Sequence, residues 1–433
     1  MENKKEKVGI ITLGCSKNTV DSERLMGQLK LNNIELVSDP NSADCVIINT
    51  CGFIDAAKEE SVNTILEAAE LKKSGNIKRV IVAGCLSERY SFDLKKEIPE
   101  VDAFFGTEDY EGILKELGAD LKRELLGERE LTSPKHYAYL KISEGCDNPC
   151  SFCAIPLMRG KHKSKPFEDL ISEATSLARK GVKELIIIGQ DTTDYGIDIY
   201  GKRILAKLLN ELSEIKGIEW IRLLYAYPSH FPNDVIEVIA KNSKICKYID
   251  MPLQHITDRV LKSMRRGISS KRTKSVIKEL KEKIPGLTLR TTFIVGYPAE
   301  TEADFNELCE FVKEVEFDRL GVFNYSIEEN TPSFILADPF DEEEKERRKS
   351  VLMEIQKEIS HSKNQRMVGE ELKVILDGEE GDYYIARSEK DAPEVDGEIL
   401  IEKKGSVLQL GEFYRVKILD CNEYDLFAKL ASN

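Results

Sequence analysis

The sequence predicts a multidomain α/β protein with three successive folds. Strands alternate with helices in residues 1–120, a strand–helix unit repeats six times in residues 136–365, and short strands without helices fill residues 366–433. The first pattern indicates a doubly wound parallel sheet, the second a partial (β/α)6 barrel, and the third a small antiparallel β-barrel. At 433 residues the chain is also too long for one ordinary core.

Residues 1–120 form the first predicted domain, and the charged residues 121–135, with their Ser133-Pro134 turn signal, form a linker. The strands of this domain are expected at 8–13, 34–37, 45–50, 79–83 and 103–105, and its helices at 19–31, 54–73, 87–98 and 110–117. Such alternation places helices on both faces of one parallel sheet.

Residues 136–365 form the second predicted domain, an open barrel. Its strands are expected at 138–142, 184–188, 220–224, 248–251, 288–294 and 319–325. Their starts are 28 to 46 residues apart, which suits right-handed crossovers, and six units fall short of the eight that close a barrel. A charged helix at 341–365 is expected to tie this domain to the last one. The strands of that last domain are expected at 371–376, 383–386, 398–401, 414–420 and 425–430.

The composition is that of a globular protein without a membrane segment. Hydrophobic residues make up 41% of the chain and charged residues 32%, and no run approaches the roughly 18 apolar residues of a membrane helix. The charged start, Met1–Lys7, lacks the features of a signal peptide, so we expect the protein in the cytoplasm. In that reducing compartment, the ten cysteines indicate metal binding, catalysis or burial rather than disulfides.

Three cysteines, Cys146, Cys150 and Cys153, stand close together in the loop after the first expected barrel strand. A 4Fe–4S cluster usually takes four thiolates, so three leave one iron open to a substrate or cofactor. The alternatives are a zinc site and plain burial. A zinc site would need a fourth ligand, and His162 is the lone candidate nearby.

This spacing is the motif of radical S-adenosylmethionine (SAM) enzymes, and the resemblance covers the second domain. It implies that the amino and carboxylate groups of SAM bind the open iron and that an electron from the cluster cleaves SAM to a 5′-deoxyadenosyl radical. It also implies SAM contacts at Gln190, after the second strand, and at Gly296, in the turn after the fifth. The alternative at each position is an ordinary turn.

Three further cysteines, Cys15, Cys51 and Cys85, each directly follow an expected strand of the first domain. In a doubly wound sheet these positions share the carboxyl edge, where ligands bind. The helix N-termini that follow are expected to lower the thiol pKa values. The alternative is three small residues buried at turns.

The stretches 13–18, 49–53 and 83–85 resemble the amino-terminal domain of methylthiotransferases, which continue with a radical SAM triad and end in a TRAM β-barrel. The resemblance covers nearly the whole chain in that order. It implies a second 4Fe–4S cluster on Cys15, Cys51 and Cys85, whose open iron carries the inserted sulfur. The other cysteines, Cys45, Cys246, Cys309 and Cys421, match no motif and are expected to be structural. No catalytic side chain is assigned.

Methylthiotransferases modify either an adenosine of transfer RNA or an aspartate of a ribosomal protein. The stretches 14–23, 156–160, 190–196 and 391–397 resemble the ribosomal-protein branch, the RimO type. The transfer-RNA branch usually has Gln-Met-Asn where this chain has Ser16-Lys17-Asn18. The resemblance implies methylthio insertion at the β-carbon of an aspartate of small-subunit ribosomal protein S-twelve, with an electron donor that the sequence does not identify.

The net charge favours the same substrate. The chain has 63 Lys and Arg residues and 77 Asp and Glu residues, so its net charge is 63 − 77 = −14. For residues 366–433 alone, the net charge is 9 − 16 = −7. An acidic barrel repels phosphates and attracts a basic ribosomal protein, so no direct transfer-RNA substrate is expected. The alternative is an acidic surface that serves solubility. The expected docking residues are Glu379, Glu380, Asp382, Asp391, Glu394 and Asp396.

Two other functions stay open on the sequence alone. One is a transfer-RNA adenosine methylthiotransferase, which shares the chemistry and differs in its substrate. The other is a non-catalytic iron–sulfur sensor that binds the ribosome, which would leave SAM uncleaved.

Overall fold

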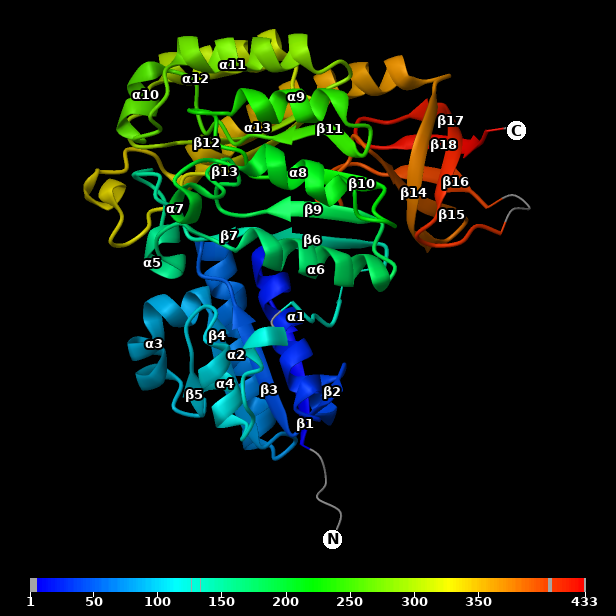
Figure 1. Ribbon diagram of the computed structural model, residues 1–433. Coiled ribbons are helices and arrows are strands. Elements are labelled where there is room, and N and C mark those ends of the chain that lie inside the picture. The colour runs from blue at the N-terminus through cyan, green and yellow to red at the C-terminus, as the bar shows by residue number, and fades with distance from the viewer. Residues whose placement is uncertain (1–5, 126, 133, 404–406, 432–433) are drawn as a thin grey trace.

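The computed structural model describes residues 6–125, 127–132, 134–403 and 407–431. Met1–Lys5 and Ser133, which entered the expectations on the chain start and the linker, lie outside these ranges. The first domain lies below the middle one, and the C-terminal barrel packs at one end of the middle domain (Figure 1). Within the described ranges, no helix combines the length and apolar character needed to cross a membrane.

The first domain is a five-stranded parallel sheet with the strand order β2-β1-β3-β4-β5. Its strands are β1 (Lys7–Thr12), β2 (Glu35–Val37), β3 (Cys45–Thr50), β4 (Arg79–Gly84) and β5 (Ala103–Phe104). Its helices are α1 (Ser16–Leu31), α2 (Asp55–Lys73), α3 (Cys85–Glu97) and α4 (Tyr110–Glu116), and the short 3-10 turn η1 (Pro40–Ser42) lies in one of its loops. A second 3-10 turn, η2 (Arg123–Leu125), lies in the segment that follows the domain.

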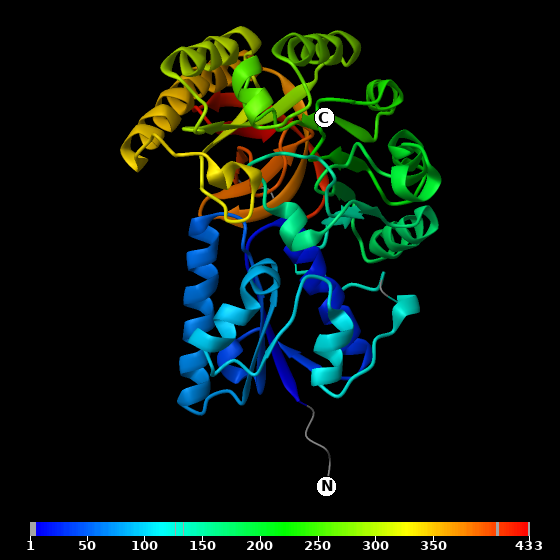
Figure 2. The ribbon, with the colours of Figure 1, turned by 90° about the vertical axis from the view of Figure 1, so that its left-hand side faces the viewer.

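Helices cover both faces of this sheet, as the alternation predicted. Apolar residues of α2 and α3 pack on one face, and those of α1 and α4 on the other. Figure 2 shows α1 and α2 on opposite sides of the sheet. Val46 and Ile47, neighbours on the buried strand β3, belong to the two different cores. A continuous apolar strand therefore serves both layers.

The middle domain is a six-stranded parallel sheet in the order β13-β12-β11-β10-β9-β6. Its strands are β6 (Tyr137–Lys141), β9 (Glu184–Ile188), β10 (Trp220–Leu223), β11 (Ile245–Asp250), β12 (Thr288–Val295) and β13 (Arg319–Asn324). Its long helices are α6 (Phe167–Arg179), α8 (Leu205–Ser213), α9 (Asn233–Lys241), α11 (Ser270–Lys283), α12 (Glu302–Val315) and α13 (Glu342–Met367). Because β6 and β13 do not pair, the barrel is partial, as expected.

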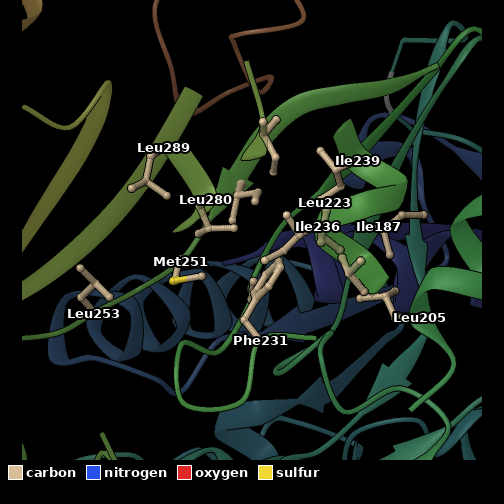
Figure 3. Close-up of a cluster of buried hydrophobic side chains, with 14 of the residues drawn as sticks. Ile187, Leu205, Leu223, Phe231, Ile236, Ile239, Met251, Leu253, Leu280 and Leu289 are labelled. Atoms are coloured by element: carbon tan, nitrogen blue, oxygen red, sulfur yellow. The ribbon is translucent and has the colours of Figure 1, made fainter. Parts of the chain in front are cut away.

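Between the outer helices and the sheet lies the main core. Ile187 and Leu223 of the strands face Leu205, Ile236 and other helical side chains (Figure 3). Shorter elements complete the domain: the hairpin β7 (Ser143–Glu144) and β8 (Lys163–Ser164), helices α5 (Ile155–Arg159), α7 (Ile197–Tyr200) and α10 (Asp258–Ser263), and the 3-10 turn η3 (Pro332–Ile335).

The C-terminal domain is a closed barrel in the order β14-β15-β16-β18-β17. Its strands are β14 (Glu371–Glu380), β15 (Tyr383–Ser388), β16 (Ile399–Glu402), β17 (Phe413–Cys421) and β18 (Leu426–Leu430). The expected small antiparallel β-barrel is confirmed, with one exception: β16 and β18 are parallel. A closed ring of five strands cannot alternate direction throughout, so one parallel pair must occur.

The C-terminal barrel packs against the amino-terminal ends of the middle strands. Ile375 and Ala392 of the barrel join a core with the inward-facing Tyr137, Trp220 and Tyr248. Polar contacts add to it: the Arg387 Nη2 donates to Glu184 Oε2 at 2.8 Å. The opposite, carboxyl ends of the middle strands are therefore left to the first domain.

Three of the expected docking residues are used in this interface. Asp391 is buried and pairs with Arg319, Asp396 accepts from Tyr248 at 2.6 Å, and Glu394 accepts from Tyr137 and Tyr139 at 3.1 Å each. The prediction that Asp391 and Asp396 contact a substrate is corrected, because arginine and tyrosine side chains of the middle domain already occupy these buried carboxylates. Glu394 is hydrogen-bonded but exposed, so its contact with a substrate stays a prediction. The other three, Glu379, Glu380 and Asp382, are exposed.

Candidate functional site

The loop after β6 holds Cys146, Cys150 and Cys153, here called the loop triad. Gly145 has φ +72°, and a Cβ there would lie 2.1 Å from the Lys161 carbonyl oxygen, so the turn into the loop requires glycine. The Cys146 N–H donates to the Gly160 carbonyl at 3.2 Å, and the Cys153 N–H donates to the Cys150 carbonyl at 3.3 Å. Backbone hydrogen bonds and this glycine turn therefore help to hold the loop in shape.

Polar side chains from the loop itself and from a distant segment contact the loop triad. The Arg266 Nη1 donates to Cys150 Sγ at 3.2 Å and its Nη2 to the Pro252 carbonyl at 2.6 Å. The Asn148 Nδ2 lies 3.4 Å from Cys146 Sγ and donates to Asp191 Oδ2 at 2.7 Å. These donors stabilise thiolates, and hydrogen bonds to the sulfurs are among the features that set the potential of an iron–sulfur cluster.

The second set, Cys15, Cys51 and Cys85, is here called the sheet-edge triad. Cys15 precedes α1 as its N-cap residue, Cys51 follows β3, and Cys85 begins α3. Gly14 has φ +90°, and a Cβ there would lie 2.9 Å from Cys51 Sγ. Glycine therefore lets the first cysteine loop lie against the second.

Burial raises the pKa of Cys85 to about 12; Arg159 opposes this rise, and the Cys15 and Cys51 thiolates add to it. The expected lowering of thiol pKa values by helix N-termini is wrong for Cys51 and Cys85, whose pKa values burial raises. In the loop triad, burial likewise raises the pKa of Cys146 to about 11 and that of Cys153 to about 12. Bound iron would have to displace these thiol protons.

The two triads flank helix α5. This helix begins two residues after Cys153, and its Met158 packs with Ala154 against Cys85 of the sheet-edge triad. Thr107 Oγ1 also donates to the Met158 carbonyl at 3.0 Å. One short helix therefore joins the loop triad to the first domain.

A charged network fixes the domains on either side of α5. Arg159 Nη1 donates to Asp21 Oδ2 at 2.8 Å and to Glu144 Oε2 at 3.0 Å. The Lys141 Nζ lies among Asp21, Glu108 and Glu144 and pairs with all three. Although these carboxylates converge as metal ligands do, the ammonium occupies their centre.

The two cations of this network keep the Asp21 carboxylate ionised. Burial would raise the pKa of Asp21, but Lys141 and Arg159 hold it at about 2.

A second ion pair joins the two domains at the far side of the middle sheet. Arg89 Nη1 of the first domain donates at 2.7 Å to Oε2 of Glu328, which follows β13. The first domain therefore contacts the middle domain at both its first and last strands.

Gln190 and Gly296, the expected SAM contacts, lie after β9 and β12. The Gln190 Nε2 donates to Glu144 Oε1 at 2.6 Å, and its buried Oε1 has no hydrogen-bond partner among the described residues. That free acceptor suits an ammonium group. Gly296 has φ +69°, and a Cβ there would lie 2.5 Å from Lys345 Cγ, so the turn itself requires this glycine. Its contact with SAM stays a prediction.

The residues present fit two iron–sulfur clusters and SAM. Each triad offers three soft thiol donors, which select iron–sulfur clusters or zinc over hard cations. The acceptor of Gln190 fits the amino group of SAM. The remaining Cys45, Cys246 and Cys309 lie in hydrophobic cores, and Cys421 packs partly buried in the C-terminal barrel.

Sequence reasoning missed Arg266, Arg159 and Asp191. Asp191 stands beside Gln190, and Arg159 stands inside a stretch noted for its resemblance, so position could have drawn attention to both. Arg266 lies more than a hundred residues from the cysteine it contacts, in a helical region without a motif. Only the fold identifies it.

Comparisons with known proteins agree with this geometry. Residues 7–106 match the family described as "Uncharacterized protein family UPF0004", residues 140–312 the "Radical SAM superfamily" and residues 368–430 the "TRAM domain". Among solved structures, the chain is similar in fold to the radical SAM methyltransferase TsrM from Kitasatospora setae. That match has a TM-score of 0.55 and 14% identity, and it covers 76% of this chain and 77% of TsrM.

Curated relatives match over the full length. A protein of Cytophaga hutchinsonii named "Ribosomal protein uS12 methylthiotransferase RimO" is 54% identical over 99% of this chain and 98% of its own. A protein of Bacteroides fragilis with the same name is 49% identical over 99% of this chain and 100% of its own. The radical SAM and UPF0004 domains together imply SAM and two 4Fe–4S clusters. The chain therefore belongs to the RimO family of radical SAM methylthiotransferases.

Proposed function

We propose that this enzyme inserts a methylthio group at the β-carbon of an aspartate of ribosomal protein uS12. The observation that carries the proposal is the pair of triads on either side of α5, in a chain whose full-length relatives bear that name. Two triads in contact through one short helix suit a reaction in which a radical forms at one site and sulfur is delivered from the other.

Each triad has its own role in the proposal. The loop triad holds the cluster that binds SAM, with Gln190 accepting from the SAM amino group, and the sheet-edge triad holds the cluster that carries sulfur. When bound, these groups supply the electron that cleaves one SAM and the site where a second SAM delivers its methyl group. The chain's own residues donate to the loop thiols, through Arg266 and Asn148, and fix the two domains, through Arg159 and Lys141.

The acidic C-terminal barrel supports a protein substrate over an RNA. The exposed Glu379, Glu380 and Asp382 keep part of the net charge of −7 at the surface, where a basic partner would meet it. Lys403 pairs with Glu379 at 2.9 Å and reduces that field locally. We place the enzyme in the cytoplasm, where ribosomal proteins are made; its electron donor is not assigned.

A direct competition between substrates tests the proposal. Anaerobically reconstituted enzyme, reduced and given SAM, is offered uS12 and transfer RNA in the same reaction, and both are examined by mass spectrometry. We expect a methylthio group on an aspartate of uS12 and unmodified RNA. A methylthio group on an adenosine, or intact SAM throughout, would replace this function by one of the two alternatives.

A further inference from the structure

Lys17 is a buried cation without a hydrogen-bonding partner. It is 7% exposed, and its Nζ lies 2.9 Å from the centre of the Tyr225 ring. No hydrogen bond or ion pair joins this ammonium to any residue that the structure describes. The Nζ atom is not among the fully buried side-chain atoms that lack a partner, so the tip of this largely buried side chain remains open to solvent. An anion that reaches it would meet a cation that no carboxylate already pairs.

The other buried cations of the described chain differ from Lys17. Arg24, Arg129, Lys141, Arg159, Arg222, Lys345, Arg348 and Arg387 each pair with a carboxylate, and Arg266 donates to Cys150 and a carbonyl. The absence of an acceptor is therefore specific to Lys17 among the buried lysine and arginine side chains that the structure describes.

Two neighbouring features also favour an anion here. Ser16 Oγ, the previous residue in the same helical turn, is buried without a hydrogen-bond partner among the described residues. The first turn of α1 contains no acidic residue, and its N-cap residue Cys15 makes no side-chain cap. The free N–H groups and the dipole of a helix N-terminus attract negative charge.

Lys17 also lies where the reaction must occur. It stands two residues after Cys15 of the sheet-edge triad, and its partner Tyr225 follows β10 at the carboxyl ends of the barrel strands. Tyr225 has φ 58°, an uncommon backbone for a bulky residue. Its N–H donates to Asp250 Oδ2 at 3.1 Å and its carbonyl accepts from Thr192 N–H at 3.0 Å. The strained turn therefore holds the ring beneath the ammonium.

We propose that Lys17 binds the carboxylate of the substrate aspartate and thereby places its β-carbon beside the sheet-edge triad. The inference rests on the proposed function. The carboxyl carbon is bonded directly to the β-carbon, so a cation that holds the carboxylate leaves the reacting atom one bond away. A carboxylate that enters a buried site stays ionised only if it meets a cation and hydrogen-bond donors, which Lys17 and the α1 N-terminus supply.

The test compares two peptides of uS12, one with the target aspartate and one with asparagine in its place. Their dissociation constants are measured with full-length, reconstituted enzyme in the presence of SAM. We expect the wild-type enzyme to prefer the aspartate peptide by about tenfold or more, since a hydrogen bond to a charged group typically supplies that difference. Lys17→Met, which keeps the apolar stem over Tyr225, should bind both peptides equally, and Lys17→Arg should restore part of the preference.

Controls separate this role from misfolding and from SAM binding. Lys78→Met removes a 75%-exposed side chain of the same domain and should leave the preference intact. Iron content, SAM affinity and deoxyadenosine formation should be unchanged in Lys17→Met. The inference is overturned if Lys17→Met keeps the preference for the aspartate peptide. It is also overturned if the variant loses affinity for SAM, because Lys17 would then bind the carboxylate of SAM. If wild-type enzyme leaves uS12 unmodified, the proposed function fails, and this inference with it.

Discussion

The loop triad lies within one loop, residues 146–153, whereas the sheet-edge triad gathers cysteines from the ends of three strands. The first depends on a glycine turn and a few backbone hydrogen bonds, and the second exists only when the first domain is folded. The proposed SAM-binding site therefore depends mainly on its own loop and on contacts with one distant segment, such as the hydrogen bond from Ser151 Oγ to the Ser263 carbonyl. The proposed sulfur-carrying site depends on the packing of a whole domain, so we expect it to be the more easily disrupted of the two.

The triads also differ in their arginines. Arg266 donates to a loop thiol and to one carbonyl and has no carboxylate partner among the described residues. Arg159 lies beside the sheet-edge triad and opposes the rise of the Cys85 pKa, but it shares its charge with Asp21 and Glu144. We therefore expect Arg266 to act directly on the cluster of the loop triad. Arg159 should act mainly on the domain junction, which we define as the ion pairs of Lys141 and Arg159 with Asp21 and Glu144.

Removal of the loop triad should have the largest effect. With Cys146, Cys150 and Cys153 replaced by alanine, SAM cleavage should fall to background, because the iron that binds SAM is lost. About half the iron should remain on the sheet-edge triad. Deoxyadenosine is measured by chromatography and iron by a colorimetric assay. Residual SAM cleavage at a substantial fraction of the wild-type rate would contradict the assignment.

Disruption of the domain junction should have the next largest effect, a loss of stability. We expect this loss to affect the sheet-edge triad before the loop triad. Asp21→Asn removes a buried carboxylate that pairs with both Lys141 and Arg159. Removal of one partner of a buried ion pair typically lowers the free energy of unfolding by about 3–5 kcal/mol. Denaturant unfolding of the apoprotein measures this loss. Asp55→Asn, on a 74%-exposed side chain of the same domain, is the matched control and should change stability by less than about 0.5 kcal/mol.

The pH dependence of that difference follows from Asp21. Its folded pKa of about 2 lies below the ordinary value of 3.8, so the ionised carboxylate stabilises the fold above about pH 4. This contribution is lost as the pH falls from 4 to 2. The stability difference between wild type and Asp21→Asn should shrink over that window, and a difference that stays constant there would show that Asp21 is not held ionised by its partners.

The arginine variants should have the smallest effect. Arg266→Met should lower the reduction potential of the loop cluster, because a positive charge and an N–H group beside the sulfur stabilise the added electron. Arg159→Met should leave that potential in place while it loosens the junction. Redox titration followed by electron paramagnetic resonance measures both. Equal shifts of the loop-cluster potential in the two variants would remove the distinction between the arginines.

The sequence predicted what depends on local pattern. Apolar β-branched runs such as Val46–Ile48 predicted the strands. Three cysteines in one loop predicted a cluster site, and that assignment stays a prediction. It failed where tertiary contacts decide: Asp391 and Asp396 look like loop acids but meet arginine and tyrosine side chains of another domain. The thiol pKa values failed for the same reason, since burial of Cys85 outweighs its place at a helix start.

One variant tests the separation of the two triads most directly. Replacement of Cys15, Cys51 and Cys85 together by alanine should reduce the iron from about eight to about four per chain, one cluster instead of two. In the same sample, deoxyadenosine should still form from SAM, and the methylthio product on uS12 should be absent. An unchanged iron count, or the loss of deoxyadenosine from a folded variant that keeps four irons, would contradict two separate clusters with separate roles.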